Sequence, residues 1–149
     1  LEYLEVHNPS DWPEALGGWE LTGGVDMTFA DATWLDPGAT LLVLPFDPTA
    51  PGNAQRLLTF REHHDLTDTT ALTGGYDGSL SDTSEAVSLW RLTETGTLRL
   101  EDGVSYGAAA LSEAEAGDSL HRLGPQSLGL EASSWLPGTP TPGAAFPEP

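Results

Sequence analysis

Apolar and polar residues alternate over several short stretches of the chain, the pattern of β-strands that bury one face. The clearest stretches are residues 3–7, 19–22 and 86–92. Turn-forming residues separate them, with 17 Gly and 12 Pro among 149 residues. We therefore expect short strands packed in two layers, a β-sandwich. The side chains expected between the layers are Leu4, Val6, Trp19, Leu21, Leu41, Val43, Val87, Leu89 and Trp135.

Two stretches depart from this alternation. Residues 40–46 are apolar almost throughout, which predicts a central strand that ends at Pro45, preceded by a tight turn at Pro37 and Gly38. Residues 53–66 contain no Gly or Pro, so we expect a short helix of about two or three turns over one end of the sandwich. In this helix Asn53 is the expected cap, and the side chains expected on one side are Leu57, Leu58 and Phe60.

The second half of the chain predicts fewer strands. Residues 97–107 favour one or two strands around a turn at Asp102 and Gly103, and residues 119–123 favour a last short strand. Residues 108–117 are expected to form a loop. Proline recurs after Trp135, so we expect an extended tail there that does not pair in a sheet. The sequence thus predicts one all-β, antiparallel domain over residues 1–136 and a Pro/Gly-rich tail over residues 137–149.

Charge is the next constraint on function. The chain has 23 acidic residues against five arginines and no lysine, a net charge of −18. Nucleic acids and anionic membranes attract basic surfaces, so we expect neither as a partner. No apolar run approaches the roughly 20 residues that span a bilayer, so membrane insertion is not expected either. The acidity indicates a soluble surface or, alternatively, one that binds divalent cations.

Calcium is the one ion that the pattern of acids allows. Calcium binds clustered carboxylate and carbonyl oxygens in loops. The candidate ligands are Asp65, Asp68, Asp77 and Asp82. Their spacing is not that of a helix-loop-helix calcium site. No other cofactor is expected.

Nothing in the sequence indicates catalysis. Cysteine is absent, and no G-x-S-x-G, H-E-x-x-H or phosphate-binding glycine loop occurs. His63 and His64 are adjacent, so their rings cannot readily share one metal, and an exposed polar face is the simpler interpretation. Trp12 and Trp34 lie in or near turns, where exposed rings could stack on a sugar.

Six phrases, in order, resemble the lamin-tail domain family. They are "YLEVHNPS", "LGGWELTGG", "LDPGATLLVL", "GGYDGSLSDTSEAVSLW", "EDGVSYG" and "SLHRL" followed by "SSWLPGTPTPG". In the same order, the first three are similar to the family's opening aromatic-Ile-Glu-Leu-x-Asn-Pro, its Leu-x-Gly-Trp-x-Leu and its Leu-x-Pro-Gly-x-x-Leu-Val. The fourth and fifth are similar to its Leu-Ser-Asn-x-Gly-Glu-x-Val-x-Leu and its Val-x-Tyr. The last is similar to the family's close, which is Ser-Leu-x-Arg, a Trp and then Gly-Thr-Pro-x-Pro-Gly. The resemblance covers nearly the whole chain.

The resemblance implies an immunoglobulin-like β-sandwich of the bacterial, extracellular type. It implies a non-catalytic binding or structural module of a larger exported protein, which contacts a protein or a cell-surface polymer. The alternative is a carbohydrate- or calcium-binding adhesion domain on the same architecture. In this resemblance Trp19 anchors the interior and Trp135 fixes the last segment.

The resemblance also concerns the start of the chain. The family's first strand, a phrase like Ile-x-Glu-Ile, has no counterpart before "YLEVHN", so we expect this segment to be an exposed strand edge. Such an edge predicts weak self-association through backbone pairing. Cover by the C-terminal tail is the least favoured outcome, because proline lacks the N–H that a ladder needs.

Overall fold

The computed structural model describes residues 2–144. The strands are β1 (Leu4–His7), β2 (Glu14–Ala15), β3 (Glu20–Gly23), β4 (Val25–Thr28), β5 (Trp34–Leu35), β6 (Thr40–Leu44), β7 (Leu72–Gly74), β8 (Asp77–Gly78), β9 (Glu85–Leu92), β10 (Leu98–Tyr106), β11 (Ser119–Arg122) and β12 (Trp135–Gly138). Helix α1 spans Ala54–His63, and short 3-10 helices span Pro51–Asn53 and Ala132–Ser134. The predicted all-β class with one short helix is confirmed.

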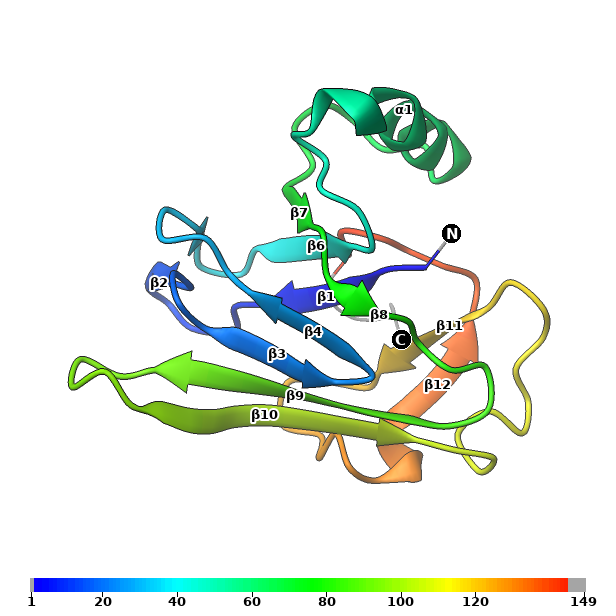
Figure 1. Cartoon of the computed structure of the whole chain (residues 1–149). Coiled ribbons are helices and arrows are strands. Elements are labelled where there is room, and N and C mark those ends of the chain that lie inside the picture. Colours follow the sequence, from blue (N-terminus) through cyan, green and yellow to red (C-terminus); the bar gives the residue numbers. More distant parts are fainter. Residues whose placement is uncertain (1, 145–149) are drawn as a thin grey trace.

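Two sheets form the layers of the sandwich (Figure 1). One has the strand order β1-β6-β7, and the other has the order β10-β9-β3-β4-β8. Most pairs are antiparallel, as expected, but β6 and β7 run parallel. The parallel pair exists because the chain leaves β6, passes through α1 and returns in the same direction, as a crossover connection requires.

The core lies between these sheets. From one side come Leu41 and Val43 of β6, and from the other Leu21 of β3 and Val87 of β9, all buried. Trp19 completes this set with 4% of its surface exposed. The remaining expected core residues, Leu4, Val6 and Leu89, are partly buried and pack against this cluster, while Trp135 is half-buried.

Strand β6 is the central strand of its sheet, as its apolar run predicts, and it is buried on both faces. Its other face, Leu42 and Leu44, packs against Phe46 and against Phe60 of α1. The helix therefore covers the outer face of the three-stranded sheet (Figure 1). Of the three side chains expected on one side of the helix, Phe60 and the partly buried Leu57 pack in this cluster, whereas Leu58 is exposed.

The predicted cap of this helix is wrong in detail. Asn53 occupies the N-cap position, but its side chain makes no capping hydrogen bond. Its Nδ2 instead donates to the carbonyl oxygen of Asp47 at 3.0 Å, and its Oδ1 accepts from Arg56 at 3.4 Å. The asparagine thus ties the helix start to the end of the preceding loop.

Two predictions for the second half of the chain are also corrected. Asp102 and Gly103 do not form a turn: β10 runs through them as one strand, with a bulge between Leu100 and Asp102. The bulge places Asp102 where its carboxylate pairs with Arg122 of β11, whose guanidinium also donates to the Ser127 carbonyl at 3.1 Å. A side-chain pairing distant in sequence therefore replaces the expected local turn.

The segment after Trp135 does pair in a sheet, contrary to expectation. Strand β12 pairs antiparallel with β11, with Pro137 opposite Leu120, and so crosses the expected boundary at residue 136. Proline is tolerated because β12 is the edge of a two-stranded sheet. The chain then returns to β1, where the Gly143 N–H donates to the Glu5 carboxylate at 2.6 Å. Residues 145–149 of the expected tail lie outside the described residues.

Within residues 2–144 no helix is long and apolar enough to cross a membrane.

Candidate binding site

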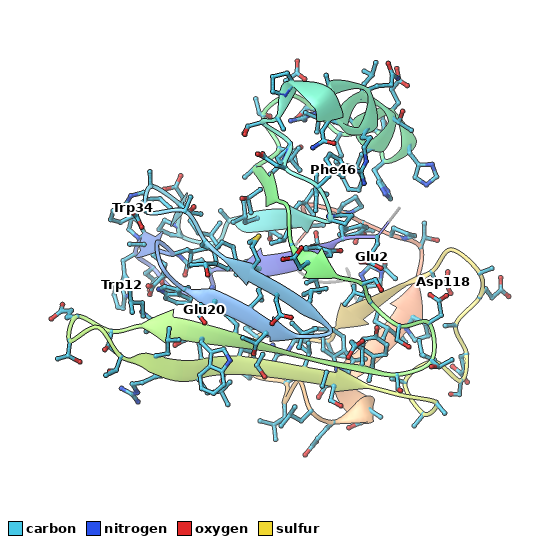
Figure 2. The ribbon with its side chains drawn as sticks, in the orientation of Figure 1. Glu2, Trp12, Glu20, Trp34, Phe46 and Asp118 are labelled. Carbon is cyan, nitrogen blue, oxygen red and sulfur yellow. The ribbon has the colours of Figure 1, made fainter. Side chains whose placement is uncertain are left out.

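The two most exposed tryptophans lie at one end of the sandwich. Trp12 and Trp34 leave 65% and 63% of their surfaces exposed. Figure 2 shows both at the end that carries β2, with their segments side by side. Tryptophan is normally among the best-buried residues, so two such rings at one place indicate a contact surface. We call this surface, formed by residues 8–16 and 31–38, the tryptophan end.

Asn8 holds the two segments of the tryptophan end together. Its side chain is almost fully buried, with 3% of the residue exposed, directly after β1. Its Nδ2 donates to the carbonyl oxygens of Trp12 at 2.8 Å, Leu35 at 3.0 Å and Asp36 at 3.2 Å. Its Oδ1 accepts from the N–H of Ser10 at 3.0 Å and from the Ser10 hydroxyl at 2.7 Å. One amide thus fixes the backbone beside both tryptophans.

Trp34 belongs to a short two-stranded antiparallel ribbon. Strands β2 and β5 pair with Ala15 opposite Trp34, and the Leu16 N–H donates to the Thr33 carbonyl at 2.9 Å. Leu16 and Leu35 point into the core and are buried. Since successive side chains of a strand face opposite sides, burial of Leu35 turns Trp34 outward. The ring is therefore exposed by the register of a well-anchored strand.

The Pro37-Gly38 turn closes the second segment of the tryptophan end. Gly38 has a φ of 69°, the value that favours glycine, and follows Pro37 in the turn that the sequence predicts. The Gly38 N–H donates to the Asn8 carbonyl at 2.9 Å. The Pro37-Gly38 turn is thus joined to the same asparagine as the tryptophans.

The charges at this end are negative in excess. Arg91 is held by Glu14 at 3.1 Å and by Glu101 at 2.8 Å, and these carboxylates raise the pKa of its guanidinium. Arg91 and the nearby Arg99 together lower the pKa of Glu101. In the described part of the chain, by contrast, the exposed aspartates that flank the tryptophans form no ion pair. These are Asp11, Asp31 and Asp36.

The calcium candidates do not converge. Asp65 follows the end of α1 with a φ of 52°, and Asp68 lies in the next turn. Asp77 lies on β8 opposite Asp26 of β4, while Asp82 lies in the following loop. Among residues 2–144 no three His, Cys, Asp or Glu side chains gather closely enough to hold a metal ion.

The two adjacent histidines differ in their surroundings. His63 is exposed, whereas the His64 ring packs against Phe60 at 4.7 Å and Tyr3 at 5.4 Å between centroids. Its buried Nε2 has no hydrogen-bond partner, and burial lowers its pKa. His64 therefore serves the helix–sheet contact, which corrects the prediction that both histidines belong to an exposed polar face.

Two of the shallow hollows on the described part of the chain lie elsewhere. One, of about 200 Å³, lies between α1 and the sheet, lined by Phe46, Phe60 and Arg56, whose guanidinium lies 4.4 Å from the Phe46 centroid. The other, of about 310 Å³, lies on the outer face of the larger sheet beside Glu20 and Asp77. Figure 2 labels Phe46, which lies near α1 and away from the tryptophan end, and Glu20 at the start of β3, which lies nearer to Trp12.

The sequence indicated that Trp12 and Trp34 could be exposed, but it did not reveal the role of Asn8. The phrase Asn8-Pro9-Ser10 was interpretable only as the end of a strand, since the carbonyls that Asn8 binds at Leu35 and Asp36 are 27 and 28 residues away. Comparison with protein-family models, with curated proteins and with solved structures finds no match for this chain.

Proposed function

We propose that this chain is a non-catalytic binding module and that the tryptophan end is its contact surface. The observation that carries the proposal is the exposure of Trp12 and Trp34 on a backbone fixed by the buried side chain of Asn8. Tryptophans dominate the binding energy of many interfaces, because a large rigid ring gains contact area at little cost in conformational entropy. A fixed backbone lowers that cost further.

The wider setting is proposed from the family resemblance. The module is an immunoglobulin-like domain of the lamin-tail type, part of a larger bacterial protein that is exported to the surface or the medium. Its partner is a protein or a cell-surface polymer. The six phrases and their order support this proposal, together with the buried position of Trp19 and the Pro37-Gly38 turn.

The test compares the chain with its Trp12→Ala/Trp34→Ala variant. Both are incubated with cellulose, chitin, peptidoglycan and a panel of immobilised extracellular proteins, and the retained fraction is measured. We expect retention on at least one surface and its loss in the variant. The matched control is Leu128→Ala/Leu130→Ala, which removes exposed apolar side chains (62% and 68% exposed) from the loop before β12. Equal retention of all three proteins would contradict the assigned surface.

The non-catalytic part of the proposal has its own test. The purified chain is assayed against chromogenic esters, phosphates and glycosides, where we expect no turnover above the buffer rate. Turnover that scales with protein concentration and survives repeated purification would overturn it.

A further inference from the structure

The partner of the tryptophan end can be specified further, on the assumption that the proposed function holds. An exposed indole face attracts cations through its quadrupole, and tryptophan is the strongest aromatic partner in such contacts. The chain already uses this chemistry inside the fold, where the Arg91 guanidinium lies 4.3 Å from the Trp19 ring centroid. Trp12 and Trp34 offer two further rings to an external group.

The negative charge of the aspartates near these two rings also favours a cationic group. Asp11 directly precedes Trp12, and Asp31 and Asp36 flank Trp34. These carboxylates form no ion pair in the described part of the chain, while the nearby Arg91 is neutralised by Glu14 and Glu101. A cation that stacks on a ring here would therefore meet negative charge that no internal group has compensated.

From these two observations we propose that the tryptophan end binds a cationic segment of a protein partner, rich in lysine or arginine, whose side chains lie on the Trp12 and Trp34 rings. The aspartates steer the segment to this end and pair with its charges. The Asn8 amide ties together the two backbone segments that carry the rings, so one extended segment can contact both of them.

A labelled heptalysine peptide is the probe, and fluorescence anisotropy gives its Kd for the whole chain. We expect Trp12→Ala and Trp34→Ala each to weaken binding roughly 2- to 5-fold, the range of an exposed cation–π contact. We expect binding to weaken strongly between about 50 and 500 mM salt, because exposed charges are screened. A Gly/Ser heptapeptide should not bind.

Two variants that lose the same number of charges distinguish binding at the tryptophan end from general attraction between a basic peptide and an acidic protein. The first is Asp11→Asn/Asp31→Asn/Asp36→Asn at the tryptophan end. The second is Asp65→Asn/Asp68→Asn/Glu113→Gln, which removes an equal number of negative charges, three, from loops elsewhere. We expect the first to raise Kd about tenfold or more and the second less than about twofold. Equal effects of both variants, or no effect of the tryptophan substitutions, would overturn the inference.

A second experiment with neutral sugars distinguishes failure of the cationic-partner proposal from failure of the proposed binding function. NMR of the indole N–H signals of Trp12 and Trp34 is followed on addition of cellohexaose or chitohexaose. Shifts with a sugar but none with heptalysine would leave the binding module in place and refute the cationic partner. If neither probe shifts these signals, the cationic partner is refuted, and the retention experiment above then decides the proposed function separately.

Discussion

The guanidinium of Arg91 lies over the ring of Trp19, 4.3 Å from its centroid. The same guanidinium binds Glu101 of the neighbouring strand β10 and Glu14 of β2. The most deeply placed tryptophan is thus covered by a cation whose charge two glutamates offset. This arrangement joins the end ribbon, the larger sheet and the core at one point.

Replacing Trp19 with Ala tests the core. The residue is 4% exposed, so the substitution removes a large buried ring and should lower the free energy of unfolding by about 3–5 kcal/mol. Denaturant unfolding measures the loss. Trp12→Ala is the control, since an exposed side chain should change stability by about 0.5 kcal/mol or less. Similar losses for both variants would contradict the described packing.

Replacing Asn8 with Ala tests the clamp of the tryptophan end. Three carbonyl oxygens lose a buried donor, and we expect a loss of about 2–3 kcal/mol. Hydrogen exchange should also accelerate in residues 8–16 and 33–38. Asn53→Ala removes a more exposed amide that also donates to a carbonyl, so it should cost clearly less. A variant of Asn8 that exchanges like the parent chain would show that the clamp is dispensable.

Glu5 makes stability depend on pH. Burial raises its pKa to about 7, although the Gly143 N–H favours the charged form. Because the folded state favours the neutral carboxyl, its contribution is complete below the ordinary pKa of 4.5 and is lost as pH rises through about 7. Glu5→Gln should therefore gain stability relative to the parent chain between pH 4.5 and pH 8. Glu5 is an exposed residue on the edge strand β1, so the surrounding solvent screens this effect and the gain should be small.

Thermal melts of both proteins across this pH range measure the difference. Glu131→Gln, in an exposed loop, is the control for the loss of one surface charge. If the Glu5→Gln difference does not change with pH across this range, the environment assigned to Glu5 is wrong.

Strand β1 predicts weak self-association. It lies at the edge of its sheet, with β6 on one side, and an edge strand can pair with another chain. Gly143 of the C-terminal segment does reach Glu5 of this strand. Its N–H donates to the Glu5 side chain, so the backbone edge of β1 gains no hydrogen bond from it. Light scattering at rising concentration should show a small growth in mean mass. A constant monomer mass at the highest concentration would refute this prediction.

Nucleic acids should not bind. With a net charge of −18, the chain has few cations to displace the counterions of phosphates. Gel-shift assays with duplex DNA and single-stranded RNA at about 150 mM salt should show free nucleic acid at micromolar protein. A shifted band that weakens as salt rises would contradict this.

The fold was predictable where the local pattern matched the final environment. The apolar run of residues 40–46 predicted a central strand, and β6 indeed lies between β1 and β7, while Pro37-Gly38 predicted the turn before it. The prediction failed where distant contacts decide the conformation. Asp102-Gly103 has the composition of a turn, but pairing of Asp102 with Arg122 and the close approach of Gly129 to Gly103 keep β10 continuous.

The candidate site was predictable to a similar extent. The turn context of Trp12 and Trp34 indicated exposure, because such positions seldom enter a core. Their common location could not be predicted, since it depends on the β2–β5 pairing and on bonds from Asn8 across 27 and 28 residues. The calcium candidates were close in sequence, but the strands separate them.

The pairing of β3 with β9 sets the order in which this chain can fold. Leu21 of β3 lies opposite Leu89 of β9. A loop of more than sixty residues must therefore close before the β3–β9 pair of the larger sheet can form. Contacts so distant in sequence slow the search for the native state, typically to milliseconds or seconds. During synthesis β3 can pair with β4 at once, but it must wait for β9 to emerge. Until then β3 lacks its partner strand, and its open edge can pair with a neighbouring nascent chain, which favours aggregation of the incomplete domain.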